Sequence, residues 1–263
     1  MKGVILAGGL GTRLEPLTRV TNKHLLPVFD RPMIHYPLQT LINAGIEEIL
    51  LVTGGPHAGA FLQLLRDGRE FALQHLHYTY QDGEGGIAAA LALAEEFADG
   101  GRICVMLGDN IIEGNIKAAA GRFRRQARGA RIIVKEVPDA HRFGVATLDG
   151  DRVVAITEKP RRPASRYAVT GIYMYDARVF DVIRTLKPSG RGELEITDVN
   201  TWYLERKELT SEALEGWWTD AGTVASLHRA GNLVAETGAN RMNGPTTRLL
   251  GRSTGRPSKG RRR

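Results

Sequence analysis

The chain has 263 residues, a hydrophobic fraction of 42%, one cysteine and a formal net charge of +7. This length can bury one substantial core, and no apolar run approaches the roughly 20 residues of a transmembrane helix, which argues against an integral membrane protein. A single cysteine forms no internal disulfide and the N-terminus lacks a secretory pattern, so we expect a cytoplasmic protein.

The positive charge is concentrated at one end of the chain. From residue 248 onward there are seven cations and no acid, so residues 1–247 are formally neutral. A neutral body gives no electrostatic reason to expect nucleic-acid binding. We predict a folded domain over residues 1–240 and a basic, disordered tail over residues 241–263, which is rich in Gly, Ser, Thr and Pro. A tail that contacts RNA or an acidic membrane surface is the less favoured alternative.

The apolar run from Val4 to Ala7 predicts a buried parallel strand. Strand and helix patterns then alternate along the first part of the chain. Further strands are expected at 48–53, 76–81 and 102–107, and helices at 33–44, 58–65 and 87–97. This alternation is typical of a mainly parallel sheet covered by helices on both faces, with the functional site at the carboxyl ends of the strands.

After residue 109 the pattern changes. Strands are expected at 145–148, 153–157 and 168–175, and helices return at 177–186, 196–206 and 223–236. The predicted fold class is therefore α/β: a Rossmann-like, mostly parallel mixed sheet flanked by helices, with a small antiparallel extension.

The first strand leads into a loop with Gly8, Gly9 and Gly11, followed by Thr12 and Arg13. Glycines at the carboxyl end of a strand let backbone N–H groups approach an anion, and the arginine adds a permanent, forked cation. The dinucleotide fingerprint fails because its third glycine is a leucine, and the ATPase loop fails because its lysine is missing. The loop predicts a binding site for a polyphosphate, most readily that of a nucleotide.

The continuation of the chain resembles a known family. Residues 6–18 read LAGGLGTRLEPLT and residues 23–28 read KHLLPV. Together they resemble the signature of the sugar-phosphate nucleotidyltransferases, and the similarity extends to about residue 240. The branch that it resembles most transfers thymidylyl groups. The resemblance implies dTTP and α-D-glucose 1-phosphate as substrates, dTDP-glucose and pyrophosphate as products, Mg²⁺ as the metal and a homo-oligomeric enzyme.

The resemblance assigns the nucleotide-binding and metal-binding roles. The glycine loop cradles the nucleotide, Arg13 holds its β- and γ-phosphates, and Lys23 points toward the α-phosphate. Asp109, in LGDN, and Asp220, in WWTDAGT, correspond to the family's two metal ligands. Carboxylate oxygens suit Mg²⁺, which usually shares its coordination shell with phosphates. Ala221 stands where threonine is commoner, which removes a hydroxyl and leaves the carboxylate before it.

The antiparallel extension carries the residues that resemble the family's sugar-phosphate site. Lys159, in EKP, is expected to bind the phosphate, and Glu158 to accept hydrogen bonds from sugar hydroxyls. Arg191, in RGELEITD, adds a second cation. Gly144 and Val169 lie in residues 143–145 and 168–171, which resemble the two elements that offer backbone groups to the hexose. Recognition by the backbone explains the glycine in each element, because a side chain there would block the approach.

Base recognition is expected in residues 80–88. The amide of Gln81 can donate to and accept from a pyrimidine edge, and Gly86 lets the backbone contact the base. The family often reads Q-x-x-P-x-G-L-A here, whereas this chain has no proline and has Ile87 for leucine. The choice between thymine and uracil stays open, because one methyl group is worth only about 1–3 kcal/mol of discrimination.

Two alternatives stand beside this interpretation. The first is an enzyme that uses UTP or another hexose 1-phosphate. The second is a catalytically silent nucleotide-sugar-binding regulatory protein, which the retention of the charged residues above disfavours, because a sensor needs no intact metal pair. The chain after Glu236 is short and polar, whereas longer relatives continue into helices that build a subunit interface and an allosteric site. We therefore expect no second regulatory site of that kind.

Overall fold

A computed structural model describes residues 1–150 and 152–242. Most of the predicted basic tail lies outside the described residues, so the tail and the domain boundary at 240 stay predictions. The strands are β1 (Lys2–Ala7), β2 (Pro27–Val28), β3 (Arg31–Pro32), β4 (Glu48–Gly54), β5 (His75–Gln81), β6 (Ile103–Leu107), β7 (Asn110–Ile112), β8 (Ala130–Glu136), β9 (Gly144–Asp149), β10 (Arg152–Glu158), β11 (Tyr167–Tyr175), β12 (Leu209–Ala213) and β13 (Trp218–Asp220). The α-helices are α1 (His35–Asn43), α2 (Ala58–Leu65), α3 (Ile87–Ala92), α4 (Glu95–Ala98), α5 (Lys117–Arg125), α6 (Val179–Thr185), α7 (Ile196–Glu205) and α8 (Val224–Thr237).

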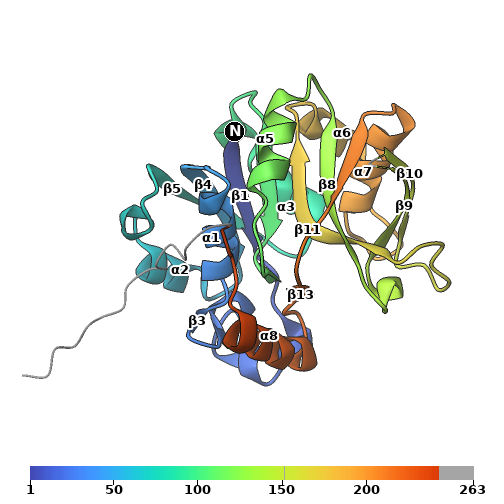
Figure 1. Ribbon diagram of the computed structural model, residues 1–263. Coiled ribbons are helices and arrows are strands. Elements are labelled where there is room, and N and C mark those ends of the chain that lie inside the picture. Colours follow the sequence, from blue (N-terminus) through green and yellow to red (C-terminus); the bar gives the residue numbers. More distant parts are fainter. Residues whose placement is uncertain (151, 243–263) are drawn as a thin grey trace, which may run out of the picture.

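A nine-stranded mixed sheet forms the centre of the molecule (Figure 1), in the order β5-β4-β1-β6-β11-β8-β12-β10-β9. The strands β5, β4, β1 and β6 are parallel neighbours. Beyond β6 the sheet is mixed. β11 pairs antiparallel with β6 and β8, and β10 does so with β12 and β9, whereas β12 and β8 are parallel. The α/β class and the mixed sheet are confirmed. The predicted antiparallel extension continues the same sheet, and β9 also pairs back onto β11.

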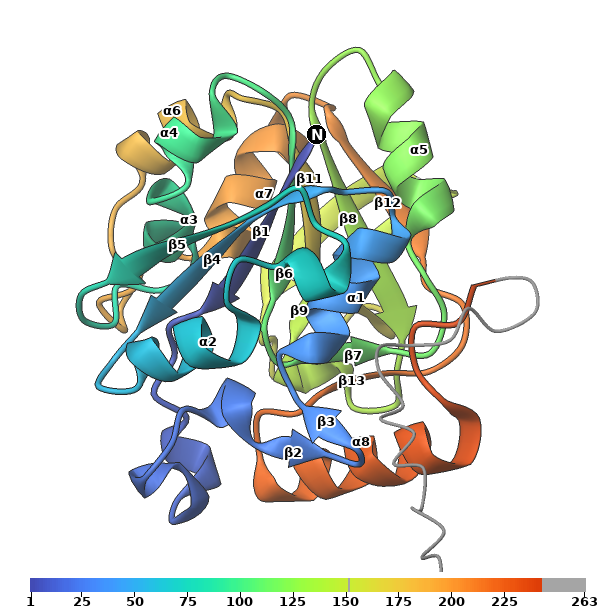
Figure 2. The same cartoon turned by 90° about the vertical axis from the view of Figure 1, so that its left-hand side faces the viewer.

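The side chains of β1 divide the core into two layers. Val4 and Leu6 belong to the apolar cluster under α3, α6 and α7, whereas Ile5 and Ala7 belong to the cluster under α1, α2 and α5. Figure 2 shows the two groups of helices on opposite faces of the sheet. A strand with both faces covered is apolar throughout, which explains why the run from Val4 to Ala7 has no polar alternation.

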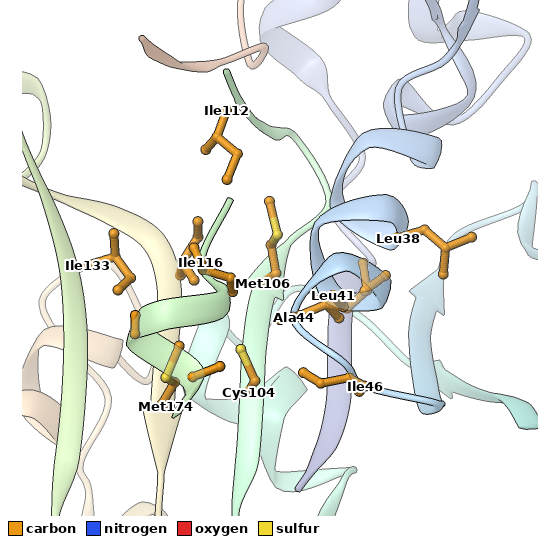
Figure 3. Close-up of a cluster of buried hydrophobic side chains, with 14 of the residues drawn as sticks. Leu38, Leu41, Ala44, Ile46, Cys104, Met106, Ile112, Ile116, Ile133 and Met174 are labelled. Carbon is orange, nitrogen blue, oxygen red and sulfur yellow. The ribbon is translucent and has the colours of Figure 1, made fainter. Parts of the chain in front are cut away.

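Figure 3 shows part of the second cluster. Leu38 and Leu41 of α1 share it with Cys104 and Met106 of β6 and with Met174 of β11. The thiol of Cys104 is fully buried, and burial raises its pKa to about 12. A thiol that stays protonated at neutral pH packs as a small apolar group.

Several elements were not predicted. These are α5, β8, β12 and the two short pairs, β2 with β3 and β7 with β13. In α5 only Ala119, Ala120 and Phe123 are buried, in a helix otherwise dominated by cations, so the apolar period is weak. The helix predicted over 87–97 is two helices, because α3 ends at Ala92 and α4 begins at Glu95.

Asn240 anchors the end of the described chain. Its side-chain amide donates to the carbonyl of Tyr36 at 3.0 Å and accepts from the hydroxyl of Thr40 at 2.7 Å. Its backbone N–H donates to the carbonyl of Ile112 at 2.9 Å, and its own carbonyl accepts from the side chain of Asn43 at 3.0 Å. Asn240 adopts a φ of 56°, in the left-handed region that asparagine tolerates. These bonds tie the segment after α8 to α1 and β7.

We expect Asn240→Ala to lower the free energy of unfolding by about 2–3 kcal/mol, as two side-chain hydrogen bonds are lost and alanine is strained at positive φ. Urea unfolding followed by tryptophan fluorescence measures this. Asn240→Gly removes the same bonds without the strain and should cost less than Asn240→Ala. A loss below about 0.5 kcal/mol in Asn240→Ala would show that the anchor is not needed.

Candidate active site

A cleft of about 600 Å³ opens at the carboxyl ends of the parallel strands and extends over β9, β10 and β11. Its lining includes all the predicted site residues except Gly11 and Thr12, which directly precede Arg13 in the chain. The predicted residues that line it are Gly8, Gly9, Arg13, Lys23, Gln81, Gly86, Asp109, Gly144, Glu158, Lys159, Val169, Arg191 and Asp220. Side chains from the whole length of the sequence therefore meet at one edge of the sheet.

The β7–β13 pair brings the two predicted metal ligands together. Asp220 stands opposite Asn110 in the antiparallel register, and the N–H of Ala221 donates to the carbonyl of Asp109 at 2.8 Å. A Cβ added at Gly222 would lie 3.6 Å from Asp109 Oδ2 and 3.6 Å from Asp220 Oδ2. The two carboxylates thus flank one point in the cleft.

The two carboxylates differ in their electrostatic surroundings. Burial alone would raise the pKa of Asp109, but the Lys23 ammonium, 2.7 Å from its Oδ2, holds that pKa well below its usual range. Burial raises the pKa of Asp220, and the negative charge of Asp109 raises it further, against the opposing effect of Arg142 and Arg13. An additional cation between the carboxylates would relieve this repulsion.

The charges of the cleft indicate which cation fits. Five Lys or Arg side chains face six carboxylates, namely Arg13, Lys23, Arg142, Lys159 and Arg191 against Glu84, Asp109, Glu158, Glu193, Glu195 and Asp220. A polyphosphate therefore needs further positive charge. Within the described ranges, no group of three or more His, Cys, Asp or Glu residues could hold a metal. Two carboxylates with room for phosphate oxygens fit Mg²⁺, which rarely takes an all-protein cage.

The glycine loop is packed against Lys23. Gly11 has a φ of 74°, and a Cβ there would lie 2.8 Å from the Cβ of Lys23, so glycine is required on both grounds. The guanidinium of Arg13 reaches the part of the cleft between Asp109 and Asp220. A Cβ added at Gly222, which lies beside both carboxylates, would be 3.1 Å from Arg13 Nη2. Arg13 and Lys23 therefore approach the paired carboxylates from the side of the glycine loop.

The expected base site lies where β5 and the start of α3 meet the cleft. Gln81 crosses Gly8 so closely that a Cβ on Gly8 would stand 2.6 Å from Gln81 Oε1. Gly86 has a φ of 89°, and a Cβ there would stand 2.7 Å from the carbonyl of Leu194. That carbonyl accepts the N–H of Ala88 at 3.1 Å. Gly86 thus has a packing role in joining α3 to the segment before α7.

The expected sugar-phosphate site is formed by β9, β10, β11 and α7. Glu158 Oε2 accepts the hydroxyl of Thr197 at 2.6 Å and would lie 3.4 Å from a Cβ on Gly144, which is itself close to Val169. The ammonium of Lys159 lies 3.3 Å from Glu158 Oε1. Lys159 adopts a φ of 39°, a strained conformation for a non-glycine residue that is found preferentially at functional sites.

Arg191 lines the cleft, but its guanidinium is held by carboxylates. Its Nη2 lies 2.8 and 2.9 Å from the two carboxylate oxygens of Glu195 and 3.6 Å from Glu193. A phosphate bound by Arg191 would compete with these carboxylates or share the forked guanidinium with them.

Sequence reasoning did not find Arg142. Its Nη1 donates to Asp139 at 2.8 Å, and its Nη2 lies 3.8 Å from Asp220 Oδ1. The guanidinium also lies over the ring of Phe143, 5.2 Å from the centroid. The only signal in the sequence was its place directly before the Phe143-Gly144 element.

Asn110 is a second residue without a predicted role. It is 2% exposed, and its Oδ1 accepts from the N–H of Gly171 at 2.9 Å and from the indole of Trp218 at 2.7 Å. Its Nδ2 donates to Asp109 Oδ1 at 3.0 Å. Asn110 therefore orients the Asp109 carboxylate through a hydrogen bond to its Oδ1 and joins β7 to β11 and β13.

A family model described as nucleotidyl transferase matches residues 2–237. The chain belongs to the nucleotidyl transferase family. A glucose-1-phosphate thymidylyltransferase from Neisseria meningitidis is 46% identical over 242 residues, which cover 89% of this chain and 82% of the relative. One from Actinoplanes sp. is 45% identical over 237 residues, with 89% and 78% covered. The predicted resemblance is confirmed.

Solved structures show the same fold. A crystal structure of a Bacillus anthracis protein assigned as a glucose-1-phosphate thymidylyltransferase, in complex with sucrose, is 50% identical, with a TM-score of 0.86 over 90% of this chain and 96% of that one. A UDP-glucose pyrophosphorylase complexed with UDP-glucose is 24% identical, with a TM-score of 0.77 over 89% and 98%. The second likeness shows that this nucleotidyl transferase shares that fold. In the described part of the chain, no helix has the length and apolarity to cross a membrane.

Replacing Lys23 with methionine leaves the Asp109 carboxylate buried without its partner. At pH 7 we expect the free energy of unfolding to fall by about 3 kcal/mol. Without the ammonium, burial raises the pKa of Asp109 above its unfolded value. The loss of stability of Lys23→Met relative to the parent should therefore shrink as the pH falls from about 7 to about 4, because the Asp109 carboxyl of the variant becomes neutral.

Urea unfolding across this pH range tests the prediction. Lys117→Met, on the exposed side of α5, is the control and should change the free energy of unfolding by less than about 0.5 kcal/mol at every pH. A deficit in Lys23→Met that stays constant with pH would show that Lys23 does not act through the Asp109 charge.

Proposed function

We propose that this nucleotidyl transferase moves the dTMP group of dTTP onto α-D-glucose 1-phosphate, with release of dTDP-glucose and pyrophosphate. The observation that carries the proposal is the single cleft in which Arg13 and Lys23 meet the paired carboxylates on one side and Lys159 on the other. Relatives with 41–46% identity over 89% of the chain are named for this activity. The two ends of the cleft suit two phosphate-bearing substrates.

The reaction needs no proton transfer to begin. A phosphate oxygen of glucose 1-phosphate, already ionised, forms a bond to the α-phosphorus of dTTP. The bond from that phosphorus to the bridging oxygen breaks, and its electron pair leaves with pyrophosphate. Catalysis therefore consists of holding two anions in line and stabilising the charge that moves to the leaving group.

The cations divide this task between the two sides of the cleft. Arg13 binds the departing pyrophosphate, and Lys23 exchanges its contact with Asp109 for the α-phosphate. Lys159 holds the sugar phosphate, supported by Arg191. Arg142 adds positive charge beside Asp220. Their mutual placement reduces the repulsion between the two substrates, which otherwise opposes the attack.

Asp109 and Asp220 would hold Mg²⁺, which when bound neutralises phosphate oxygens and makes the α-phosphorus a better electrophile. Glu158, fixed by its hydrogen bond from Thr197, accepts from sugar hydroxyls. Gln81 reads the pyrimidine edge. Self-association of the chain is part of the same proposal and follows from the resemblance.

The substrate prediction is tested by pyrophosphate release with glucose 1-phosphate and Mg²⁺, measured in parallel with dTTP, UTP, CTP, GTP and ATP. We expect dTTP to react fastest, and UTP to lie within about 200-fold of it, since a single methyl group limits the discrimination. Equal rates with dTTP and UTP would make it an enzyme of dual specificity for thymine and uracil nucleotides. If none of the five nucleotides reacts, other hexose 1-phosphates are tested next, and silence with those as well would favour the regulatory alternative.

Asp220→Asn separates activity from stability. We expect turnover to fall by about 10²-fold or more, the usual loss when one contact to transition-state charge is removed. Without metal, the variant should be at least as stable as the parent. The folded-state pKa of Asp220 is raised, so the ionised carboxylate costs stability at neutral pH, and the neutral amide relieves that cost.

Steady-state assays and thermal melts in EDTA measure the two effects. Asp109→Asn is the matched control: it also loses turnover but is destabilised, because it leaves Lys23 without its anion. Normal turnover in both variants would show that Asp109 and Asp220 do not hold the catalytic metal.

A further inference from the structure

Asn200 has a polar atom that the packing of the protein leaves unpaired. The residue is 1% exposed, and its Oδ1 accepts the hydroxyl of Tyr175 at 2.7 Å. Its Nδ2 is buried and has no hydrogen-bond partner among the described residues. An unpaired buried amide is costly, and a structural role toward Tyr175 needs only one of its two polar atoms.

The position of Asn200 points to a ligand as the missing partner. Asn200 lines the cleft together with Thr197, which precedes it by one helical turn on the same face of α7. The hydroxyl of Thr197 donates a hydrogen bond to Glu158. Tyr173 also lines the cleft, and its ring stacks on that of Tyr175 with the centroids 6.1 Å apart. Asn200 therefore lies in the wall of the proposed hexose site.

We infer that Asn200 is a specificity-determining residue that hydrogen-bonds one hydroxyl of the hexose 1-phosphate. This inference rests on the proposed function. The terminal torsion of asparagine is soft, so a modest rotation can present the amide to the cleft. A sugar hydroxyl both donates and accepts, and it therefore satisfies the unpaired atom whichever way the amide is turned.

The binding of such a hydroxyl has an energetic consequence. A substrate that lacks it leaves the amide buried and unpaired, as in the free protein, and gains nothing from Asn200. A substrate that has it forms a bond to a group that has no competing partner and little water to displace. Sites of this type reject an analogue without the hydroxyl more strongly than an apolar pocket does.

The test compares glucose 1-phosphate with its 2-, 3-, 4- and 6-deoxy derivatives in the parent, in Asn200→Ala and in Asn200→Ser, with kcat/KM as the readout. We expect the parent to disfavour several analogues. In Asn200→Ala the discrimination against one of them should shrink by about tenfold or more, while the others keep their ratios and KM for dTTP is unchanged. Asn200→Ser retains a small polar group, so its discrimination against that analogue should lie between those of the parent and Asn200→Ala.

Tyr175→Phe is the matched control. It removes the hydroxyl that Asn200 binds inside the protein, so it should lower the melting temperature and leave the ranking of the deoxy analogues unchanged. Melting curves of all variants identify any that is unfolded. If Asn200→Ala is unfolded, Asn200→Ser is compared with the parent in its place.

Two results would overturn the inference. If the Asn200 variants slow every analogue by the same factor, in step with their melting temperatures, the residue is structural. If their discrimination equals that of the parent, no hydroxyl contacts it. Turnover of glucose 1-phosphate by the parent preserves the proposed function in both cases, whereas no turnover with the parent would overturn the proposed function as well.

Discussion

The site is organised by the repulsion between two carboxylates that face one point, the buried Asp109 and the half-buried Asp220. Lys23 neutralises the first at 2.7 Å, whereas the second keeps a raised pKa because burial and its neighbour both oppose its charge. The protein holds this unfavourable arrangement with rigid elements. The β7–β13 ladder sets the register of Asp220 against β7, which begins directly after Asp109. Asn110 donates one hydrogen bond to Asp109 Oδ1 and is itself held by the two hydrogen bonds that its Oδ1 accepts from Gly171 and Trp218. Such stored repulsion favours a divalent cation accompanied by phosphate.

The change from parallel to antiparallel pairing divides the cleft into two ends. The parallel strands β4, β1 and β6 end at one edge, where the glycine loop and Lys23 can collect the phosphates of a nucleotide. The antiparallel strands β9 and β10 carry Gly144 and Glu158, and Lys159 follows β10, so in the proposed reaction the second anion would approach the first from this side. In the proposed reaction one continuous sheet would hold both substrates at a fixed separation, which a reaction governed by positioning requires.

Charge in this cleft is nearly balanced in pairs. Lys23 lies against Asp109, Arg142 against Asp139, Lys159 against Glu158 and Arg191 against Glu195. In the proposed reaction each of these cations would exchange a carboxylate partner for a substrate phosphate. The arrangement links substrate binding to a change of partners rather than to the approach of unpaired charges.

The sequence by itself determined the class of fold and pointed to most of the charged residues that line the cleft. Buried parallel strands are continuously apolar, so Val4 to Ala7 was recognisable, and the loop with Arg13, the Asp109 strand end and the E-K-P element are short motifs whose residues act together locally. Only the tertiary structure decided what depends on distant contacts. The β7–β13 pairing, the position of Arg142 between Asp139 and Asp220, the packing reason for Gly86 and the unpaired amide of Asn200 all arise from segments far apart in the chain. Local patterns reflect burial and backbone preference, whereas charge pairing and hydrogen-bond satisfaction depend on which elements meet in space.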